Sequence, residues 1–235
     1  MATHKQPVVA SQAVVSANHP MAAAAGLQMF SSGGSAADAA VATAFASSVV
    51  EPMMMGIFGA GYILIRDGES GGVRVIDNYS PAPLAAAPEM YLSSHAADKR
   101  ENRIGYLACA VPGSLKAWCS LHTELGRLPL PFVLAPAITY AEHGFPVSQH
   151  LYQCIEAERN NLTLFPESAR LFLPNGKPPP IGSRLINADY ATTLREIAAQ
   201  GPEIFYRGPL GARVVREAQA HGGILSSADL ENYAV

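Results

Sequence analysis

The residues from Val14 to Gly61 constrain the fold of this chain most, because two helix-forming stretches there consist almost wholly of small side chains. The first stretch, 21–30, follows Pro20, which suits the first turn of a helix because its missing N–H is not needed there. The second begins after Ser35, an N-cap residue, and carries Asp38 in its first turn, where a carboxylate favours the helix dipole. Alanine covers nearly every face of this second helix. We therefore expect it to lie buried among its neighbours, with backbone packed close to backbone.

The part of the chain that follows these helices predicts a small antiparallel sheet. Apolar, β-branched runs at 62–66 and 73–78 flank a Gly-rich turn, which is typical of a hairpin. The segment 80–88 contains three prolines and no periodicity, and predicts a loop at the end of the second strand. Before the first helix, a weak alternation at 12–17 predicts one further short strand.

The later half of the chain predicts mainly helices. The stretch 160–186 is rich in proline and predicts a long surface connection. The helices expected from apolar spacing and from Gly or Pro boundaries are 114–125, 132–142, 149–159, 191–200 and 210–220. A hairpin region followed by a helical half predicts an α+β fold rather than an alternating βαβ sheet. The length is compatible with one domain over residues 1–235.

Charge and hydropathy exclude several functional classes. With a net charge of −3, the chain has no basic footprint for nucleic acid or for an anionic membrane surface. Its longest apolar run, 39–50, is shorter than the ~20 residues that a membrane-spanning helix needs. The N-terminal residues lack the apolar core and cleavage site of a secretory signal, so the sequence as given predicts a cytoplasmic protein.

No familiar cofactor, metal or serine-hydrolase motif is present. Gly56 to Gly61 reads GxxGxG and precedes a strand, whereas a dinucleotide loop follows a strand and opens a helix; a tight turn with close backbone approach is the expected role. No HExxH, GxSxG or SxxK pattern occurs. Three cysteines without a CxxC pair suggest buried free thiols. The sequence thus predicts no cofactor and no metal.

Some conspicuous residues receive a structural interpretation. Asp38 is expected to be a first-turn partner, Glu51 a hydrogen-bonding residue at a helix end, and His19 a capping or packing residue. The methionines 53–55 follow Glu51 and Pro52, and they suit either the core or the wall of an apolar pocket, because methionine fills irregular apolar gaps.

Several short motifs, taken together in their order along the chain, resemble a known family. No single one of these motifs is specific. The matching residues in the opening segment are Ser16, His19-Pro20, Ala25-Gly26-Leu27, Gly33-Gly34, Asp38-Ala39-Ala40, Val50-Glu51-Pro52, Gly56-Ile57 and Gly59. Those further along are Pro112-Gly113, Pro136-Ala137, 141–145, 201–203, 205–208, 221–223, 229–230 and Tyr233. Together they resemble the N-terminal part of the large subunit of the γ-glutamyltranspeptidase family, whose members are N-terminal-nucleophile hydrolases.

The resemblance implies a fold, a reaction and a partner. Its fold is an αββα sandwich, of which this chain would form only an incomplete, large-subunit portion. The family's precursor cuts itself, and the threonine that opens the small subunit attacks an amide, so that the base is the new main-chain amine. The partner implied is therefore the small subunit of the same precursor, together with a small-molecule amide substrate. No catalytic residue is expected within this chain; Ser114 and Cys109 are the residues to examine first if a nucleophile has been overlooked.

One departure from the family pattern concerns the substrate. Transpeptidases of the family have an Asp-aromatic-Arg-Glu sequence at the end of the second hairpin strand, and its arginine holds the α-carboxylate of the γ-glutamyl group. Here Asn78 takes the aromatic position, Tyr79 stands in place of the arginine and Ser80 in place of the glutamate. A phenol has neither the charge nor the fork geometry of a guanidinium. Asn78, Tyr79 and Ser80 are thus the candidate substrate-binding residues.

Several functions fit this departure. The first is a γ-glutamyltransferase-like amidohydrolase that acts on γ-glutamyl or other small acyl donors. The second is a cephalosporin-acylase-like or oxamate-amidohydrolase-like amidase. The third, from another class, is a non-catalytic scaffold or assembly module, which the residues after Val235 would distinguish by the presence or absence of a threonine cleavage site.

Overall fold

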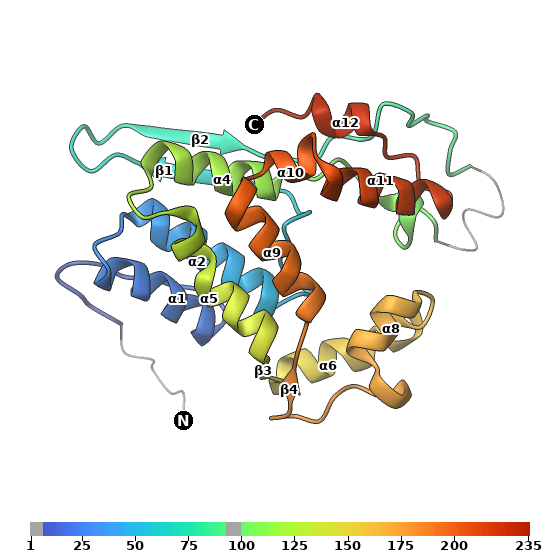
Figure 1. The fold of residues 1–235 in the computed structure, drawn as a ribbon, viewed down its shortest axis with the longest axis horizontal. Coiled ribbons are helices and arrows are strands. Elements are labelled where there is room, and N and C mark those ends of the chain that lie inside the picture. Colours follow the sequence, from blue (N-terminus) through green and yellow to red (C-terminus); the bar gives the residue numbers. More distant parts are fainter. Residues whose placement is uncertain (1–6, 93–99) are drawn as a thin grey trace.

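A computed structural model of the chain describes residues 7–92 and 100–235; residues 1–6 and 93–99 of the predicted domain lie outside the described part. The described part of the chain is helix-rich with two small sheets (Figure 1). The main helices are α1 Pro20–Ser31, α2 Ala36–Val50, α4 Ser114–Leu125, α5 Leu130–His143, α6 Gln149–Ala157, α9 Ala188–Gln200 and α11 Pro209–Ala220. The shorter ones are α7 Arg159–Leu162, α8 Pro166–Phe172, α10 Glu203–Tyr206 and α12 Ser227–Glu231. The α+β prediction is confirmed.

Helices α1 and α2 pack along each other, as their small side chains predict. A Cβ atom added at Gly26 of α1 would overlap the side chains of Thr43 and Val15, so only glycine allows this approach. At the start of α1, His19 Nδ1 accepts a hydrogen bond from the Met21 amide, which confirms the predicted capping role. At the start of α2, the predicted N-cap Ser35 is confirmed and forms a full capping box with Asp38.

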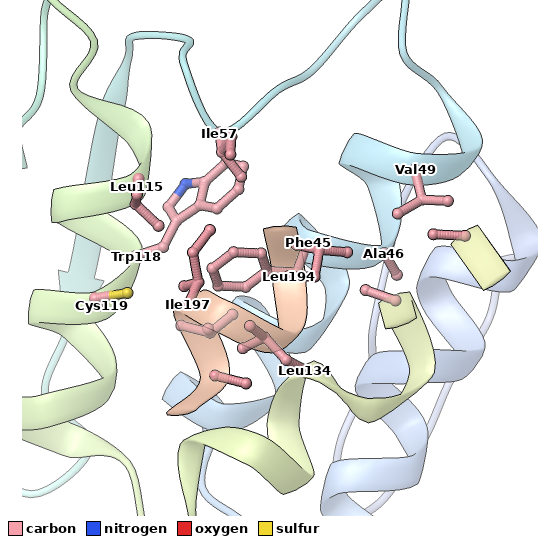
Figure 2. Close-up of a cluster of buried hydrophobic side chains, with 14 of the residues drawn as sticks. Phe45, Ala46, Val49, Ile57, Leu115, Trp118, Cys119, Leu134, Leu194 and Ile197 are labelled. Atoms are coloured by element: carbon pink, nitrogen blue, oxygen red, sulfur yellow. The ribbon is translucent and has the colours of Figure 1, made fainter. Parts of the chain in front are cut away.

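The core lies where α2, α4, α5 and α9 meet (Figure 2). Helix α5 contacts both α2 and α9. Phe45 of α2 is fully buried and meets Trp118 of α4 edge to face, with 5.1 Å between ring centroids. Leu134 of α5 and Leu194 of α9 are also fully buried and complete this cluster. The nearly all-apolar α2 is thus a central helix, as its composition indicates.

Strands β1 Tyr62–Arg66 and β2 Val73–Asp77 form the predicted antiparallel hairpin, in which Leu64 pairs with Val75. The hairpin lies next to α4 in Figure 1, and Arg74 forms an ion pair with Glu124 of that helix. The outer face of the hairpin remains apolar and exposed, with Leu64 at 68% and Val75 at 54% exposure.

The glycine turn before the hairpin has a structural role, as predicted. The Gly59 carbonyl accepts hydrogen bonds from the amides of Gly113 and Ser114, and the Ile57 carbonyl accepts one from Leu115. These N–H groups open helix α4 and would otherwise lack partners. A Cβ atom at Gly59 would crowd Ser114 Oγ at 3.2 Å. The turn therefore docks α4 against the start of the hairpin.

Two predictions about local structure are wrong. Residues 12–17 form no strand, because the segment has no paired neighbour among the described residues. The stretch 160–186 is not an irregular connection, because it contains most of α7, all of α8 and strand β4 Arg184–Leu185. Strand β4 pairs with β3 Phe145–Pro146. Proline at the first position of α8 starts a helix rather than breaking one.

The final segment returns to the hairpin end of the molecule. Helices α10, α11 and α12 contact one another, and α10 also contacts α9. In α12, Ser226 and Asp229 form a second capping box, and Asp229 Oδ1 also accepts the Leu84 amide at 2.7 Å. This bond ties the end of the chain to the loop that follows β2. Across the two described ranges, no helix has both the length and the apolarity needed to cross a bilayer.

Candidate functional site at the end of the hairpin

Asn78 closes the hairpin at the end of β2. It is buried, and its main-chain amide donates to the Gly61 carbonyl at 3.1 Å. With its side-chain amide oriented to satisfy both groups, its nitrogen donates to the Gly61 carbonyl at 2.8 Å and its oxygen accepts the Gly61 amide at 3.2 Å. Asn78 therefore fixes the direction in which the chain leaves β2.

Tyr79, the next residue, is accessible. Its side chain is 64% exposed and stacks on Tyr62, with 6.0 Å between ring centroids. Its amide donates to Asp77 Oδ1 at 2.9 Å. Ser80 is half-buried beside it. Of the three predicted substrate-binding residues, Tyr79 is thus the one whose side chain is exposed beside the apolar hairpin face.

Sequence reasoning missed the residues that hold Tyr79 in place. The Tyr233 hydroxyl, near the end of the described chain, donates to the Tyr79 carbonyl at 3.3 Å. Gly113 lies between them, because a Cβ atom there would overlap both the Asn78 carbonyl and the Tyr233 hydroxyl. Two sequence features could have indicated these contacts: the Pro112-Gly113 pair and Tyr233. Both lie far from the hairpin in the sequence.

A second tyrosine packs against Tyr233 and helps to hold it in place. Tyr206 of α10 is buried and stacks on Tyr233, with centroids 5.9 Å apart. Its hydroxyl donates to the Pro112 carbonyl at 2.9 Å and accepts the Lys116 amide at 3.2 Å. The Lys116 ammonium lies over the Tyr206 ring and donates to the Tyr233 carbonyl. Burial lowers the pKa of Lys116, an effect that Glu203 partly offsets.

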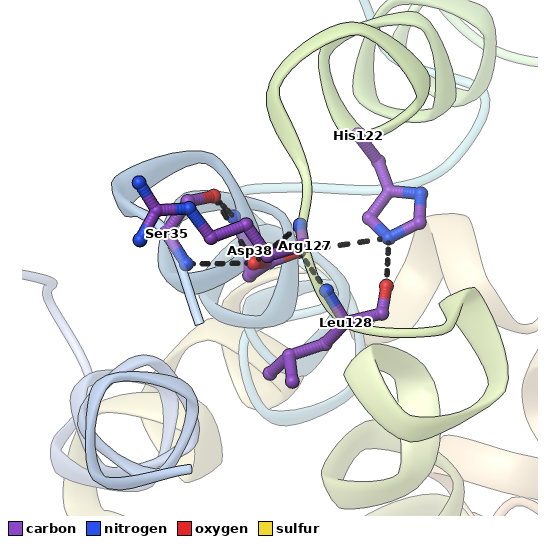
Figure 3. A network of polar contacts seen from close by, with 5 residues as sticks. All are labelled: Ser35, Asp38, His122, Arg127 and Leu128. Carbon is purple, nitrogen blue, oxygen red and sulfur yellow. Dashed lines mark hydrogen bonds and ion pairs between the residues drawn. The ribbon is translucent and has the colours of Figure 1, made fainter. Parts of the chain in front are cut away.

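Asp38 is a structural carboxylate, as predicted, and holds two segments together (Figure 3). Its oxygens accept the amides of Ser35 at 2.7 Å, Arg127 at 2.9 Å and Leu128 at 3.4 Å. Nε2 of His122 donates to the Leu128 carbonyl at 2.8 Å and lies 3.6 Å from Asp38 Oδ1. Burial acts to raise the pKa of Asp38, but the hydrogen bonds outweigh it and hold that pKa below its ordinary value.

The two residues singled out as alternative nucleophiles are poorly placed for that role. Ser114 is buried at the start of α4, against the glycine turn. Cys109 is exposed, but partial desolvation raises the pKa of its thiol and so disfavours the reactive thiolate. Cys119 is buried, and desolvation raises its pKa to about 12. Among the described residues, no group of three or more His, Cys, Asp or Glu side chains is placed to hold a metal ion.

Comparison with known proteins identifies the family. The family model for gamma-glutamyltranspeptidase matches residues 22–235. The chain belongs to the γ-glutamyltranspeptidase family. Its fold matches the crystal structure of Helicobacter pylori γ-glutamyltranspeptidase with a TM-score of 0.92 and 28% identity, over 97% of this chain and 66% of that one.

The relatives include both acylases and glutathione hydrolases. The chain is 45% identical to the acylase ACY 1 proenzyme of Pseudomonas sp. strain SE83, over 98% of this chain and 42% of that protein. It is 35% identical to the glutathione hydrolase proenzyme of Bacillus subtilis strain 168, over 99% of this chain and 40% of that protein. The cephalosporin acylase of Bacillus halodurans has a TM-score of 0.80 and 32% identity, over 97% of this chain and 45% of that one. This chain thus spans about two fifths of the length of the curated relatives named here.

Proposed function

We propose that this chain is the N-terminal part of the large subunit of an amide-bond hydrolase or acyltransferase that uses an N-terminal threonine. Membership of the γ-glutamyltranspeptidase family carries this proposal. Relatives bearing the names acylase proenzyme and glutathione hydrolase proenzyme support cleavage of a precursor into subunits. The threonine would be supplied by the small subunit of the same precursor after self-cleavage, to give a heterodimer. Its attack on the amide would give an acyl-enzyme that water or an amine resolves.

Within that reaction, this chain supplies one wall of the acyl site. The hairpin end carries Tyr79, whose main chain is fixed on both sides: Asn78 is anchored to Gly61, and the Tyr79 carbonyl accepts the Tyr233 hydroxyl. A fixed main chain gives the phenol a defined position, and a positioned group contributes more to binding than a mobile one. The exposed apolar face of Leu64 and Val75 beside it is a surface that the small subunit would cover.

Tyr79 favours an acyl donor without a free α-carboxylate. A phenol can donate one hydrogen bond but cannot neutralise a carboxylate. Leaving such a charge desolvated and unpaired costs about 2–5 kcal/mol. An uncharged acyl group incurs no such loss. The likeness to the acylase proenzyme, at 45% identity, favours the same acylase-type specificity over glutathione hydrolysis.

The test is to exchange the side chain at position 79 in the complete precursor. Tyr79→Arg should raise kcat/KM for γ-glutamyl anilides at least tenfold relative to uncharged acyl amides, because a guanidinium restores the bidentate pair. Tyr79→Phe is the matched control: it keeps the ring that stacks on Tyr62 and removes only the hydroxyl. If the wild type already prefers γ-glutamyl donors and Tyr79→Phe keeps that preference, Tyr79 does not line the acyl pocket. If the complete precursor turns over neither donor, the protein is a non-catalytic scaffold and not an enzyme.

A further inference from the structure

A cavity of about 800 Å³ lies between the segment 101–109, the start of α8 and the end of α11. Helices α8 and α11 lie on the same side of the molecule in Figure 1. The volume falls in the range of roughly 300–1,000 Å³ that is typical of small-molecule sites. Two aromatic rings, those of Tyr106 and Phe165, line the cavity together with several carboxylates. The proposed amide cleavage gives this combination of rings and carboxylates no role.

Tyr106 is the best-fixed ring of the cavity wall. The His221 ring stacks on it, with 4.8 Å between ring centroids and 20° between the ring planes. Phe165 meets it edge to face, with 6.0 Å between centroids. A Cβ atom added at Gly223 would lie 2.9 Å from the Tyr106 carbonyl oxygen, so the main chain after α11 packs closely against this residue. The face of a fixed aromatic ring attracts a cation, because the ring quadrupole is negative there.

The Glu217 carboxylate is held beside the Tyr106 ring. The Tyr106 hydroxyl donates to Glu217 Oε1 at 3.2 Å, and Nδ1 of His221 donates to the Glu217 carbonyl at 2.9 Å. Burial raises the pKa of Tyr106, and the bond to Glu217 acts in the same direction, so the phenol remains a neutral donor. A hydrogen bond to a carboxylate also polarises the phenol. The Glu217 side chain is 61% exposed, which leaves its carboxylate open to a ligand.

The charge of the cavity lining is negative. Besides Glu217, the carboxylates of Glu101 and Glu167 line it, and no lysine or arginine is among the described lining residues. Glu167 forms an ion pair with Arg170 at 2.7 Å and so adds little charge of its own. Even a protonated His221 would leave the lining negative. The cavity therefore suits a positively charged ligand and disfavours an anion.

We propose that this cavity binds an organic ammonium ion, which lies against the Tyr106 ring and pairs with the Glu217 carboxylate. An aromatic ring beside a carboxylate is an arrangement that recognises alkylated ammonium groups. A metal ion fits less well, because the described residues include no group of three or more ligating side chains. The cavity wall is preformed, since Arg100 donates to Asn161 Oδ1 at 2.8 Å and so ties the segment 101–109 to α7. The inference does not depend on the proposed amide cleavage.

Titration calorimetry of the complete precursor with choline tests the proposed charge recognition. Choline should bind with a Kd of about 1 mM or tighter, and its uncharged carbon analogue 3,3-dimethylbutanol should bind at least about tenfold more weakly. Equal affinities would show an apolar cavity that does not recognise the cation, which would overturn the proposal. A complete lack of choline binding would overturn it as well, because the rest of the precursor then fills the cavity. The measurement needs neither self-cleavage nor turnover.

Three variants of the complete precursor locate the bound cation. Tyr106→Leu removes the aromatic face, and Glu217→Gln keeps the side-chain shape but removes the charge; each should weaken choline binding at least about threefold. Glu167→Gln is the matched control, because this carboxylate is already paired with Arg170, and it should leave the Kd within about twofold of the wild type.

A thermal melt of each variant shows whether it is folded, and Glu217→Gln decides the question if Tyr106→Leu does not fold. If the folded variants bind choline as the wild type does, the cation lies elsewhere and the proposal is wrong. Equal losses in Glu217→Gln and Glu167→Gln would also overturn it, since the effect would then come from overall charge.

Discussion

Removing the Asp38 carboxylate should destabilise the chain more than replacing any exposed acidic residue. Asp38→Ala leaves three main-chain amides, those of Ser35, Arg127 and Leu128, without their acceptor in a fully buried position. A buried donor left unpaired costs about 1–3 kcal/mol, and the longest of these bonds, at 3.4 Å, contributes least. We expect a loss of about 3–5 kcal/mol in the free energy of unfolding, measured by urea titration followed by circular dichroism.

Two further variants compare the buried hydrogen bonds of Asp38 with those of an aspartate in an exposed turn. Asp67 also accepts main-chain amides, from Glu69 and Ser70, but it is fully exposed in the hairpin turn. Asp67→Ala should therefore leave the urea midpoint nearly unchanged, because water replaces the lost acceptor. Asp38→Asn, which keeps one acceptor oxygen, should lie between the two. A loss below about 1 kcal/mol for Asp38→Ala would refute the view that this carboxylate holds α2 to the 126–128 segment.

Three further outcomes are expected. The 235-residue chain by itself should show no turnover of γ-glutamyl anilides or small amides, since the nucleophile is proposed to lie outside it; robust turnover would point to Cys109 or Ser114. Gly113→Ala should cost about 1–3 kcal/mol by overlap with Asn78 and Tyr233, whereas Gly68→Ala, with open space around it, should be neutral in the same thermal melt. On acidification, stability should fall, because hydrogen bonds hold the pKa values of Asp38 and Asp229 below their ordinary value despite burial. Their contribution is complete above the unfolded pKa of about 3.9 and is lost as pH falls through the folded values, so a urea midpoint that is flat from pH 6 to 3 would contradict it.

Local chemistry made much of the fold predictable. The Ser35 and Asp38 capping box and the hairpin turn each involve residues within a few positions of one another. Helix α4 was predicted at its observed bounds because Pro112-Gly113 and Gly126 flank a single amphipathic run. The order of short motifs also sufficed for the family resemblance, since those motifs mark turns and close packing in the fold.

Short elements in the later half were not predictable in the same way. Helices α7 and α8 hold four and seven residues, too few for a helical period to show against prolines and polar side chains. Residues 12–17 carry a strand pattern, but a strand needs a paired neighbour, and no described segment supplies one. Their sequence therefore favours a strand, but the described part of the chain supplies no strand to pair with it.

The sequence by itself determined the small-residue helices, the hairpin and the identity of Tyr79 at its end, because caps, turns and periodicity act over a few residues. Only the tertiary structure decided how Tyr79 is held, since its carbonyl meets a hydroxyl 154 positions away. It also decided that Asp38 is satisfied by amides about 90 positions away. Hydrogen bonding of a buried group depends on which distant main chain reaches it, and that is fixed only when the helices pack.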